Sequence, residues 1–301
     1  MWPLWEAEGI EMSQSTAASS TETATTDTET NASETADETP ADVDTTDLLT
    51  LDVPQYLQMS GDVQLFDQIF SAVGTVTDKA RLGIKDSGIA IRAADRQGYA
   101  MVDLRVAGSS FSSFDAATGT LGVDVGRVRD ALSIGNAGDL VQFALDAASS
   151  TLEINIDGIT RTIELDPVES LRYPVEMPDI DIPATVHLSP DDMSLGLSAA
   201  DMLGDRFDLI VDSEAGEMRF VASGDTDSMT YRRAKTDLIA FEPADVEVKL
   251  DSSLVRSANA GLPDGTNRVL HIGDEVPLVL KSEFPDADGA MQFVIAPKLP
   301  N

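Results

Sequence analysis

An internal repeat is the feature that most constrains the fold of this chain. The stretch DVGRVRDALS, from Asp124, matches DSSLVRSANA, from Asp251, and the Val-Arg pair recurs with Arg129 and Arg256 127 positions apart. The preceding segments, VTDKARLGIKDSGIAIRAAD and LGDRFDLIVDSEAGEMRFVAS, share a turn after a helix, a strand, an Asp-Ser turn and a second strand. A duplication of this length in 301 residues predicts two similar halves, each with the order helix, strands, helix, strands.

Alternating apolar runs predict antiparallel sheet in both halves. The runs are IAIRA, AMVDLRV, LVQFAL, TLEINI, TRTIEL, FDLIV, EMRFVA, SMTYRRA, VEVKL, VPLVLKSEF and MQFVIA. Apolar residues at helical spacing predict four helices, at 63–73, 124–134, 190–202 and 251–260. The SPDD that begins at Ser189 is typical of a helix start with a capping serine and a first-turn proline. The expected fold class is therefore α+β.

Composition marks the ends of the two halves. Residues 1–52 hold thirteen acidic residues, no basic ones and few large apolar side chains, so we expect a disordered acidic tail. Its first residues lack the basic region of a signal peptide, and Met12 is an alternative start. Prolines 167, 174, 178 and 183 predict an extended surface connector over 167–183. The expected domains are then 53–166 and 184–301.

The net charge of the chain indicates the salt concentration in which the protein works. The formal net charge is −33, and 40 acidic residues face 20 basic ones beyond residue 52. A surface rich in acid and poor in lysine fits a cytoplasm at very high salt, where self-repulsion is screened, and so favours a halophilic archaeon. The alternative is an ordinary acidic protein, which would not need salt to fold.

Candidate catalytic and metal-ligating residues are few. The absence of cysteine excludes disulfides, thiol catalysis and cysteine-based zinc sites, and no apolar run is long enough to span a membrane. His187 and His271 stand alone in strand-like contexts, which favours ordinary structural histidines. The pairs Asp191–Asp192 and Asp225–Asp227 fit a helix cap and a turn better than a cation site. No nucleotide-binding or hydrolase motif occurs, so we expect no enzyme, no metal and no cofactor.

Several segments in order resemble one known family. IRAADRQGYAMVDLRV, GDTDSM, and VPLVLKSEF followed by MQFVIAPKLPN resemble the sliding clamps of the PCNA family, and the similarity covers about residues 55–301. The chain looks like a divergent member of haloarchaeal type. The resemblance implies the DNA clamp fold: two helix-plus-sheet domains per chain, and three identical chains closing a ring. It implies pairing between chains through edges near 159–165 and 228–234, the alternative being pairing within one chain only.

In such a ring the helices would face double-stranded DNA without reading its sequence. The resemblance places basic residues there, on the helices or just beyond them: Arg127, Arg129, Arg256, Lys79, Arg81 and Arg206. The alternative is solvated helix charge, or ion pairs with Asp124 or Asp130. The helix at 63–73 has no basic residue and that at 190–202 is acidic, so direct DNA affinity should be poor. Topological enclosure at about 1 M salt, where the Debye length is about 3 Å, needs little attraction.

The resemblance also implies a hydrophobic surface that accepts short motifs of DNA polymerase, flap nuclease, ligase and clamp loader. The matching residues are Tyr99, Val175, Met177, Ile180, Pro277, Ala296, Pro297 and Leu299. The alternative is that the connector residues only pin it to the sheet. The expected function is a cytoplasmic processivity factor for replication and repair. A clamp-fold adaptor without a processivity role is the main alternative, and an acidic hydrolase using the carboxylate pairs is a third.

Overall fold

The computed structural model describes residues 52–173 and 182–298. By compactness the chain divides into residues 1–38 and 39–301, and all described residues belong to the second unit. The predicted acidic tail, apart from Asp52, lies outside the described residues, and so does Met12.

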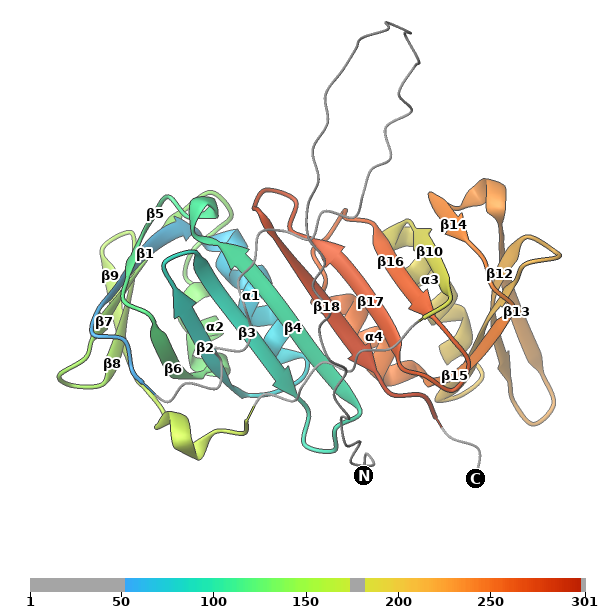
Figure 1. The fold of residues 1–301 in the computed structure, drawn as a ribbon, viewed down its shortest axis with the longest axis horizontal. Helices are drawn as coiled ribbons and strands as arrows, with labels where there is room; N and C mark the ends of the chain where they lie inside the picture. The colour runs from blue at the N-terminus through green and yellow to red at the C-terminus, as the bar shows by residue number, and fades with distance from the viewer. Residues whose placement is uncertain (1–51, 174–181, 299–301) are drawn as a thin grey trace, which may run out of the picture. The chain divides into compact units, whose positions relative to one another are not determined.

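The described residues contain four helices and eighteen strands in two matching series (Figure 1). The first half comprises β1 (Leu57–Asp62), α1 (Val63–Gly74), β2 (Lys79–Lys85), β3 (Gly88–Ala94), β4 (Ala100–Ala107), β5 (Ser113–Ala116), β6 (Gly119–Asp124), α2 (Val125–Leu132), β7 (Leu140–Asp146), β8 (Thr151–Ile156) and β9 (Ile159–Glu164). The second comprises β10 (Ala184–Leu188), α3 (Pro190–Asp201), β11 (Arg206–Asp212), β12 (Glu217–Ser223), β13 (Ser228–Ala234), β14 (Ala240–Glu242), β15 (Val246–Asp251), α4 (Ser252–Gly261), β16 (Arg268–Ile272), β17 (Leu278–Glu283) and β18 (Gly289–Ile295).

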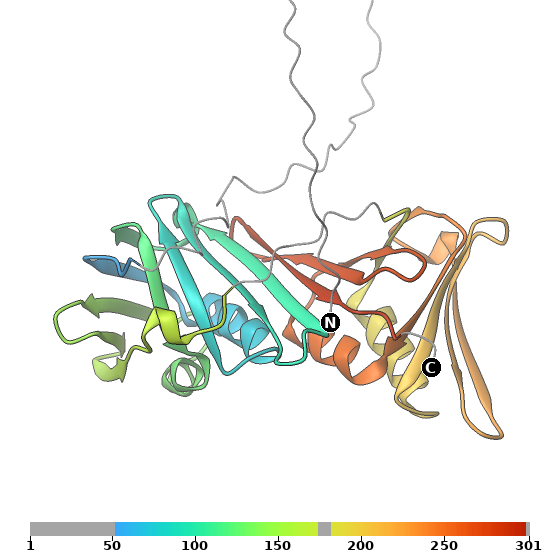
Figure 2. The ribbon, with the colours of Figure 1, turned by 60° about the horizontal axis from the view of Figure 1, so that its bottom comes forward.

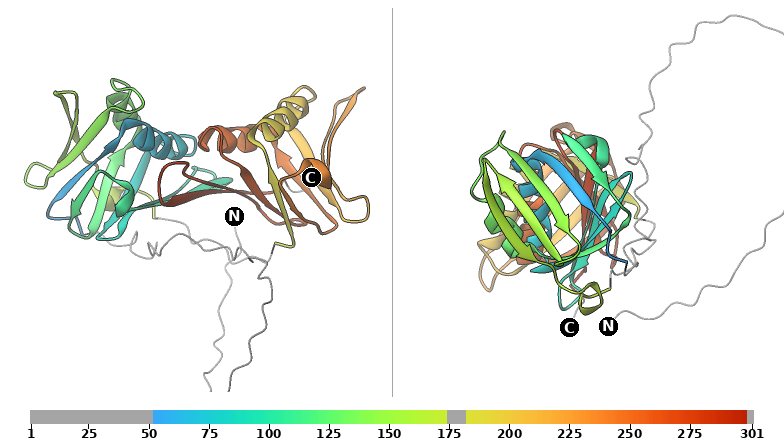
Figure 3. Two further views of the ribbon diagram at one scale, coloured as in Figure 1. Left: turned by 90° about the horizontal axis from the view of Figure 1, so that it is seen from above. Right: turned by 90° about the vertical axis from the view of Figure 1, so that its left-hand side faces the viewer.

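The four predicted helices are confirmed because caps and apolar spacing agree. Asp62, Asp124, Ser189 and Asp251 each accept a hydrogen bond from a first-turn amide of the helix that follows. Each helix buries its apolar side, and all four lie on the same side of the long central sheet (Figure 3). None of the helices in the described ranges is long and apolar enough to cross a bilayer.

The strands form three antiparallel sheets, and the repeat explains their order. The orders are β5-β1-β7-β8-β9, β14-β10-β16-β17-β18-β4-β3-β2-β6 and β13-β12-β11-β15. Each half therefore supplies one five-stranded and one four-stranded sheet. β18, the last strand of the second half, pairs with β4 over Gly289–Ile295 and Ala100–Val106, which merges two of these sheets into the nine-stranded one. Their counterparts, β9 and β13, are outermost strands at opposite ends of this unit (Figures 1 and 2).

The two halves also meet through their helices, at a glycine. A methyl group at Gly261, the last residue of α4, would lie 2.8 Å from the Phe293 ring and 3.2 Å from the Ala72 Cα of α1. We therefore expect Gly261→Ala to lower the free energy of unfolding by about 1–3 kcal/mol, the usual cost of overpacking. Gly126→Ala on α2 is the matched control, because a methyl group there meets only Asp124 Oδ1 at 3.5 Å. It should be neutral or stabilise by up to about 1 kcal/mol. Urea unfolding in concentrated KCl measures both, and equal effects would contradict the close approach of α1 and α4.

Candidate nucleic-acid interface and partner surface

Two of the predicted DNA-facing arginines lie on α2. The helix buries Val125 and Val128, which leaves Arg127 and Arg129 exposed. Arg127 Nε lies 3.7 Å from Asp124 Oδ2, so the alternative of an ion pair with the cap residue holds for this side chain. Arg129 makes no ion pair with any residue of 52–173 or 182–298. Its Nη1 would be 3.1 Å from a methyl group at Gly74, which places the guanidinium over the C-terminal end of α1, where a cation is favoured.

The third arginine is neutralised across two helices. Arg256 on α4 forms an ion pair with Asp201, the last residue of α3. The hydrogen bond from the Arg256 guanidinium lowers the pKa of the Asp201 carboxyl, and the hydrogen bond from the Ser252 hydroxyl lowers this pKa further. Both charged side chains are about half exposed. Arg256 therefore attracts an external phosphate less than a free arginine would.

The basic residues beyond the helices take three different roles. Arg206 is exposed beside Asp205, and Lys79 Nζ lies 2.6 Å from Asp166 Oδ1. Arg81 is buried, and the prediction that it faces DNA is wrong. Strand alternation turns it to the sheet face opposite Ala80 and Leu82, which pack in the main core. There it contacts the segment that follows β9: its Nη2 donates to the Leu171 carbonyl, and its guanidinium lies 4.3 Å from the centre of the Tyr173 ring.

The charge of the helices as a group is negative. They contain three arginines and five aspartates, Asp67, Asp130, Asp191, Asp192 and Asp201.

The residues described contain no cluster of histidine and acidic side chains arranged to hold a metal ion. His271 Nδ1 lies 3.2 Å from Thr185 Oγ1 on the neighbouring strand, and Asp227 accepts a backbone hydrogen bond within the β12–β13 turn.

Asp192 is held by the edge strand β13. Its Oδ1 accepts hydrogen bonds from the Tyr231 hydroxyl, at 3.0 Å, and from Arg233 Nη2. Burial raises the pKa of the Asp192 carboxyl, but hydrogen bonds with Ser189, Arg233 and Tyr231 outweigh this and lower it below the ordinary 3.8. This triad ties the first turn of α3 to the outermost strand of its sheet.

We expect Asp192→Asn to destabilise the fold at neutral pH and to have little effect in acid. Because the folded-state pKa is depressed, the carboxylate contributes stability above pH 3.8 that is lost as pH falls through the lower folded value. The loss at neutral pH should be about 1–2 kcal/mol, as for a charge-assisted hydrogen bond to a mostly buried group. Urea unfolding at about pH 7 and at successively lower pH below 3.8 measures how the difference declines. Asp191→Asn is the control, and a difference that grows in acid would contradict this account.

The predicted partner surface is partly assembled. Tyr99 is 57% exposed, and its carbonyl accepts the Ala296 amide at 2.8 Å, so the two predicted residues lie together. Pro297 follows, half-buried. Pro277 is next to Ala296 by strand register but is buried, so it supports this surface from beneath instead of facing outward. Val175, Met177, Ile180 and Leu299 lie outside the described residues.

Two residues that sequence reasoning missed hold this surface. Asp95 Oδ1 accepts the amides of Tyr99, at 2.6 Å, and Ala100, at 2.9 Å, which fixes the loop after β3. Arg172 donates from Nη1 to the Asp95 carbonyl and from Nη2 to the Arg96 carbonyl, at 2.6 and 3.0 Å. An aspartate that begins a short turn is a readable signal. The sequence carries no signal for a contact between Arg172 and a loop 77 residues away.

Comparisons with known proteins agree on one family. The N-terminal domain of proliferating cell nuclear antigen matches residues 59–182. The DNA polymerase sliding clamp of Halobacterium salinarum is 31% identical over 232 residues, which cover 77% of this chain and 94% of the relative. That of Natronomonas pharaonis is 28% identical over 228 residues, covering 76% and 92%. Both relatives come from haloarchaea, as the acidic composition predicts.

Solved structures show the same fold. The complex described as the C-terminal region of FEN-1 bound to A. fulgidus PCNA contains a chain that superimposes with a TM-score of 0.77 at 22% identity, covering 81% of this chain and 99% of that one. The PCNA of Thermococcus kodakaraensis gives 0.73 at 19% identity, covering 80% and 100%. Repeat, sheet order and sequence similarity lead to one conclusion: the chain belongs to the PCNA family of DNA polymerase sliding clamps.

Proposed function

We propose that this sliding clamp, a processivity factor and not an enzyme, works as a closed ring of three identical chains around duplex DNA. The observation that carries the ring is the junction between β18 and β4 within one chain. β9 and β13 occupy the matching positions in the repeat, and each is outermost in its sheet. Pairing of β9 in one chain with β13 in the next would repeat the internal junction. Because this contact is head-to-tail, the chains close into a ring when the rotation from one chain to the next is a whole fraction of a full turn.

In this ring the helices form the inner wall. An inner wall with few basic residues is adequate in concentrated salt, because counterion release then contributes little to DNA binding and the closed ring itself keeps the clamp on the DNA. The clamp therefore slides without adhering to phosphates. We place Arg129 as the inner cation most available to DNA, with Arg127 and Arg256 weakened by their aspartate partners.

The surface around Tyr99 and Ala296 takes partner proteins. The A. fulgidus relative binds the C-terminal region of FEN-1, which supports a similar role here. We propose that polymerase, flap nuclease, ligase and loader each place an apolar side chain on this surface, in the cytoplasm. An exposed aromatic side chain beside a held backbone segment suits such an anchor.

Primer extension on closed circular DNA tests the function. A haloarchaeal replicative polymerase, with its loader, should make long products when the clamp is present on a closed circle. The stimulation should fall to the polymerase-only level on the same template made linear, because a ring slides off an open end. Equal stimulation on both templates would contradict enclosure.

One observation favours a clamp-fold adaptor without a processivity role: the inner helices carry more aspartates than arginines. An adaptor would bind partner peptides as a trimer yet give no stimulation on the closed circle. The same primer extension experiment therefore separates the two functions.

Contact with DNA should respond to Arg129 and Asp201 in opposite directions. Arg129→Ala removes the helix arginine that has no ion pair within residues 52–173 and 182–298, and should lower the slope of log affinity against log salt by up to about 0.9 for each phosphate that is no longer neutralised. Asp201→Asn frees Arg256 and should raise affinity. Binding of a labelled linear duplex, titrated over a series of KCl concentrations that keep the ring assembled, measures both. Asp191→Asn, which frees no arginine, is the control. Weaker binding by Asp201→Asn would contradict this assignment.

A further inference from the structure

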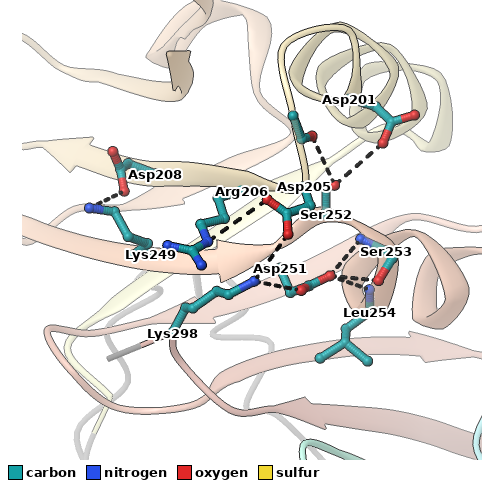
Figure 4. Close-up of polar contacts among 11 residues, drawn as sticks. Asp201, Asp205, Arg206, Asp208, Lys249, Asp251, Ser252, Ser253, Leu254 and Lys298 are labelled. Carbon is teal, nitrogen blue, oxygen red and sulfur yellow. Dashed lines mark hydrogen bonds and ion pairs between the residues drawn. The ribbon is translucent and has the colours of Figure 1, made fainter. Parts of the chain in front are cut away.

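The last described residue, Lys298, fastens the C-terminal segment to the second half. Its amide donates to the Lys249 carbonyl at 2.7 Å, and its Nζ lies 2.9 Å from Asp251 Oδ2 and 3.6 Å from Asp205 Oδ2 (Figure 4). The Lys298 side chain is only 27% exposed. These contacts, here called the C-terminal clasp (Lys298, Asp251 and Asp205), come directly after Ala296 and Pro297 of the partner surface.

The main acceptor of the C-terminal clasp is fixed by the fold. Asp251 caps α4 by accepting the amides of Ser253 and Leu254 with its Oδ1, which leaves Oδ2 for Lys298. Burial raises the pKa of the Asp251 carboxyl, but hydrogen bonds from Ser253 and Lys298 outweigh it and lower the pKa. The Asp205 carbonyl accepts the Ser252 amide at 2.9 Å, which holds the turn before β11 against the same helix start. Lys298 therefore binds one carboxylate, that of Asp251, whose position is already determined, and a second, that of Asp205, whose side chain is 75% exposed.

The first half holds its exit segment with an equivalent backbone hydrogen bond and with an ion pair of its own. The Asp166 amide donates to the Gly122 carbonyl at 3.0 Å, and its Oδ1 lies 2.6 Å from Lys79 Nζ. The Asp78 carbonyl accepts the first amide of α2, as Asp205 does for α4. In each half this ion pair stands where the chain leaves the last strand, before the connector in one case and before the C-terminal residues in the other. The backbone acceptors are equivalent, since Gly122 and Lys249 each lie two residues before the helix cap, but Lys79 corresponds to Arg206 and not to an acceptor of the C-terminal clasp. A backbone hydrogen bond and an ion pair at each exit indicate that holding the exit segment is their role.

We infer that Lys298 is a positioning residue for partner binding: the C-terminal clasp holds Ala296 and Pro297 beside Tyr99 so that an apolar peptide of a partner meets a surface already ordered. This inference rests on the proposed function of that surface. A segment fixed before association loses less conformational freedom on binding, and affinity rises by that amount. The clasp contributes no contact to the peptide itself. Because the pair is partly buried, concentrated salt screens it less than an exposed pair.

Four variants test the C-terminal clasp with a labelled peptide from the C-terminal region of A. fulgidus FEN-1, in concentrated KCl. Lys298→Met and Asp251→Asn should raise the Kd about three- to tenfold, as for loss of a partly buried ion pair. Asparagine keeps the helix cap, so Asp251→Asn removes only the charge. Lys298→Arg should stay within about twofold. Lys249→Met, which removes a neighbouring lysine paired with Asp208, should match the wild type.

Hydrogen exchange of the Lys298 and Ala296 amides in the free protein gives a second readout. Both amides should exchange faster in Lys298→Met and at the wild-type rate in Lys249→Met. Equal peptide affinity and equal exchange in wild type and Lys298→Met would overturn the inference. Failure of the wild type itself to bind the peptide would instead count against the proposed partner surface.

Discussion

Replacing Thr230 by proline is expected to break the ring into single chains while leaving each chain folded. Thr230 lies in the middle of β13, the outermost strand of its sheet. The Lys235 amide donates to the Gly216 carbonyl, toward β12. Because amides alternate in direction along an antiparallel strand, those of Arg233 and Tyr231 also face β12, and that of Thr230 faces outward. Proline at position 230 therefore removes a donor from the junction between chains without removing one from the sheet within the chain.

Light scattering of the particle in concentrated KCl measures the result. The wild type should give about 96 kDa, three times the chain mass of 32.0 kDa, and Thr230→Pro should give the mass of one chain. The matched control is Thr230→Ala, which keeps the amide and should remain a trimer. Urea unfolding should place the proline variant within about 1 kcal/mol of the alanine variant, as expected for a surface change. A trimer of Thr230→Pro would contradict pairing through β13.

A mixture of two broken chains tests the direction of the contact. Directly after β9 the Leu165 amide donates to the Ser150 carbonyl, so by the same alternation the Thr162 amide faces outward. Thr162→Pro damages β9 but keeps β13, and Thr230→Pro does the reverse. Each alone should be monomeric, whereas their mixture has one intact junction and should form a dimer of about 64 kDa. No dimer, or a trimer, would contradict head-to-tail pairing of β9 with β13.

Local signals sufficed for the helices and missed some strands, among them β6 at one end of the nine-stranded sheet. α2 and α4 were predictable because an aspartate cap precedes apolar residues at helical spacing. β6, which contains Gly119 and Gly122, was not among the predicted strands. The structure uses both for close approach: a methyl group at Gly122 would overlap the Asp166 carbonyl oxygen, and one at Gly119 would lie 2.5 Å from the Pro54 nitrogen. Sequence alone does not distinguish a glycine that turns the chain from one that admits a neighbour.

The candidate sites divide in the same way. Exposure of Arg127 and Arg129 followed from helical spacing, whereas the Arg256–Asp201 pair joins residues 55 positions apart and carries no local signal. Arg81 lies close to the end of α1 in sequence, which suggests a position near the helices, but it belongs to β2. In a strand, the side chains of neighbouring residues point to opposite faces of the sheet. The spacing of residues within a helix or strand predicts which face each side chain occupies. Only the assembled sheets show which residues that face contacts.

Long-range repulsion and short-range ion pairs predict opposite effects of salt on this protein. The ion pairs join groups in direct contact, such as Arg127–Asp124 and Arg256–Asp201, and exposed pairs of this kind contribute little to stability. The net charge of −33 acts over longer distances. Lowering the salt from about 1 M to 0.1 M lengthens the Debye length from about 3 to 10 Å. The repulsion among the many acidic side chains therefore increases strongly, whereas the attraction within each close ion pair increases little. Repulsion should therefore win.

We accordingly expect dilution of KCl to dissociate the ring first and then unfold the chain. Ring closure brings three acidic chains together, so it should fail at a higher salt concentration than folding does. Between about 1 and 0.1 M KCl the thermal midpoint should fall by roughly 10 °C or more, since about 2–4 °C accompanies each kcal/mol in domains of 150–250 residues. Light scattering and circular dichroism on the same samples give the order of the two steps. Sucrose in place of KCl is the control, because it favours compact states without screening charge. Full rescue by sucrose, or a higher midpoint in dilute salt, would show that ion pairs or solvent exclusion govern stability instead of repulsion.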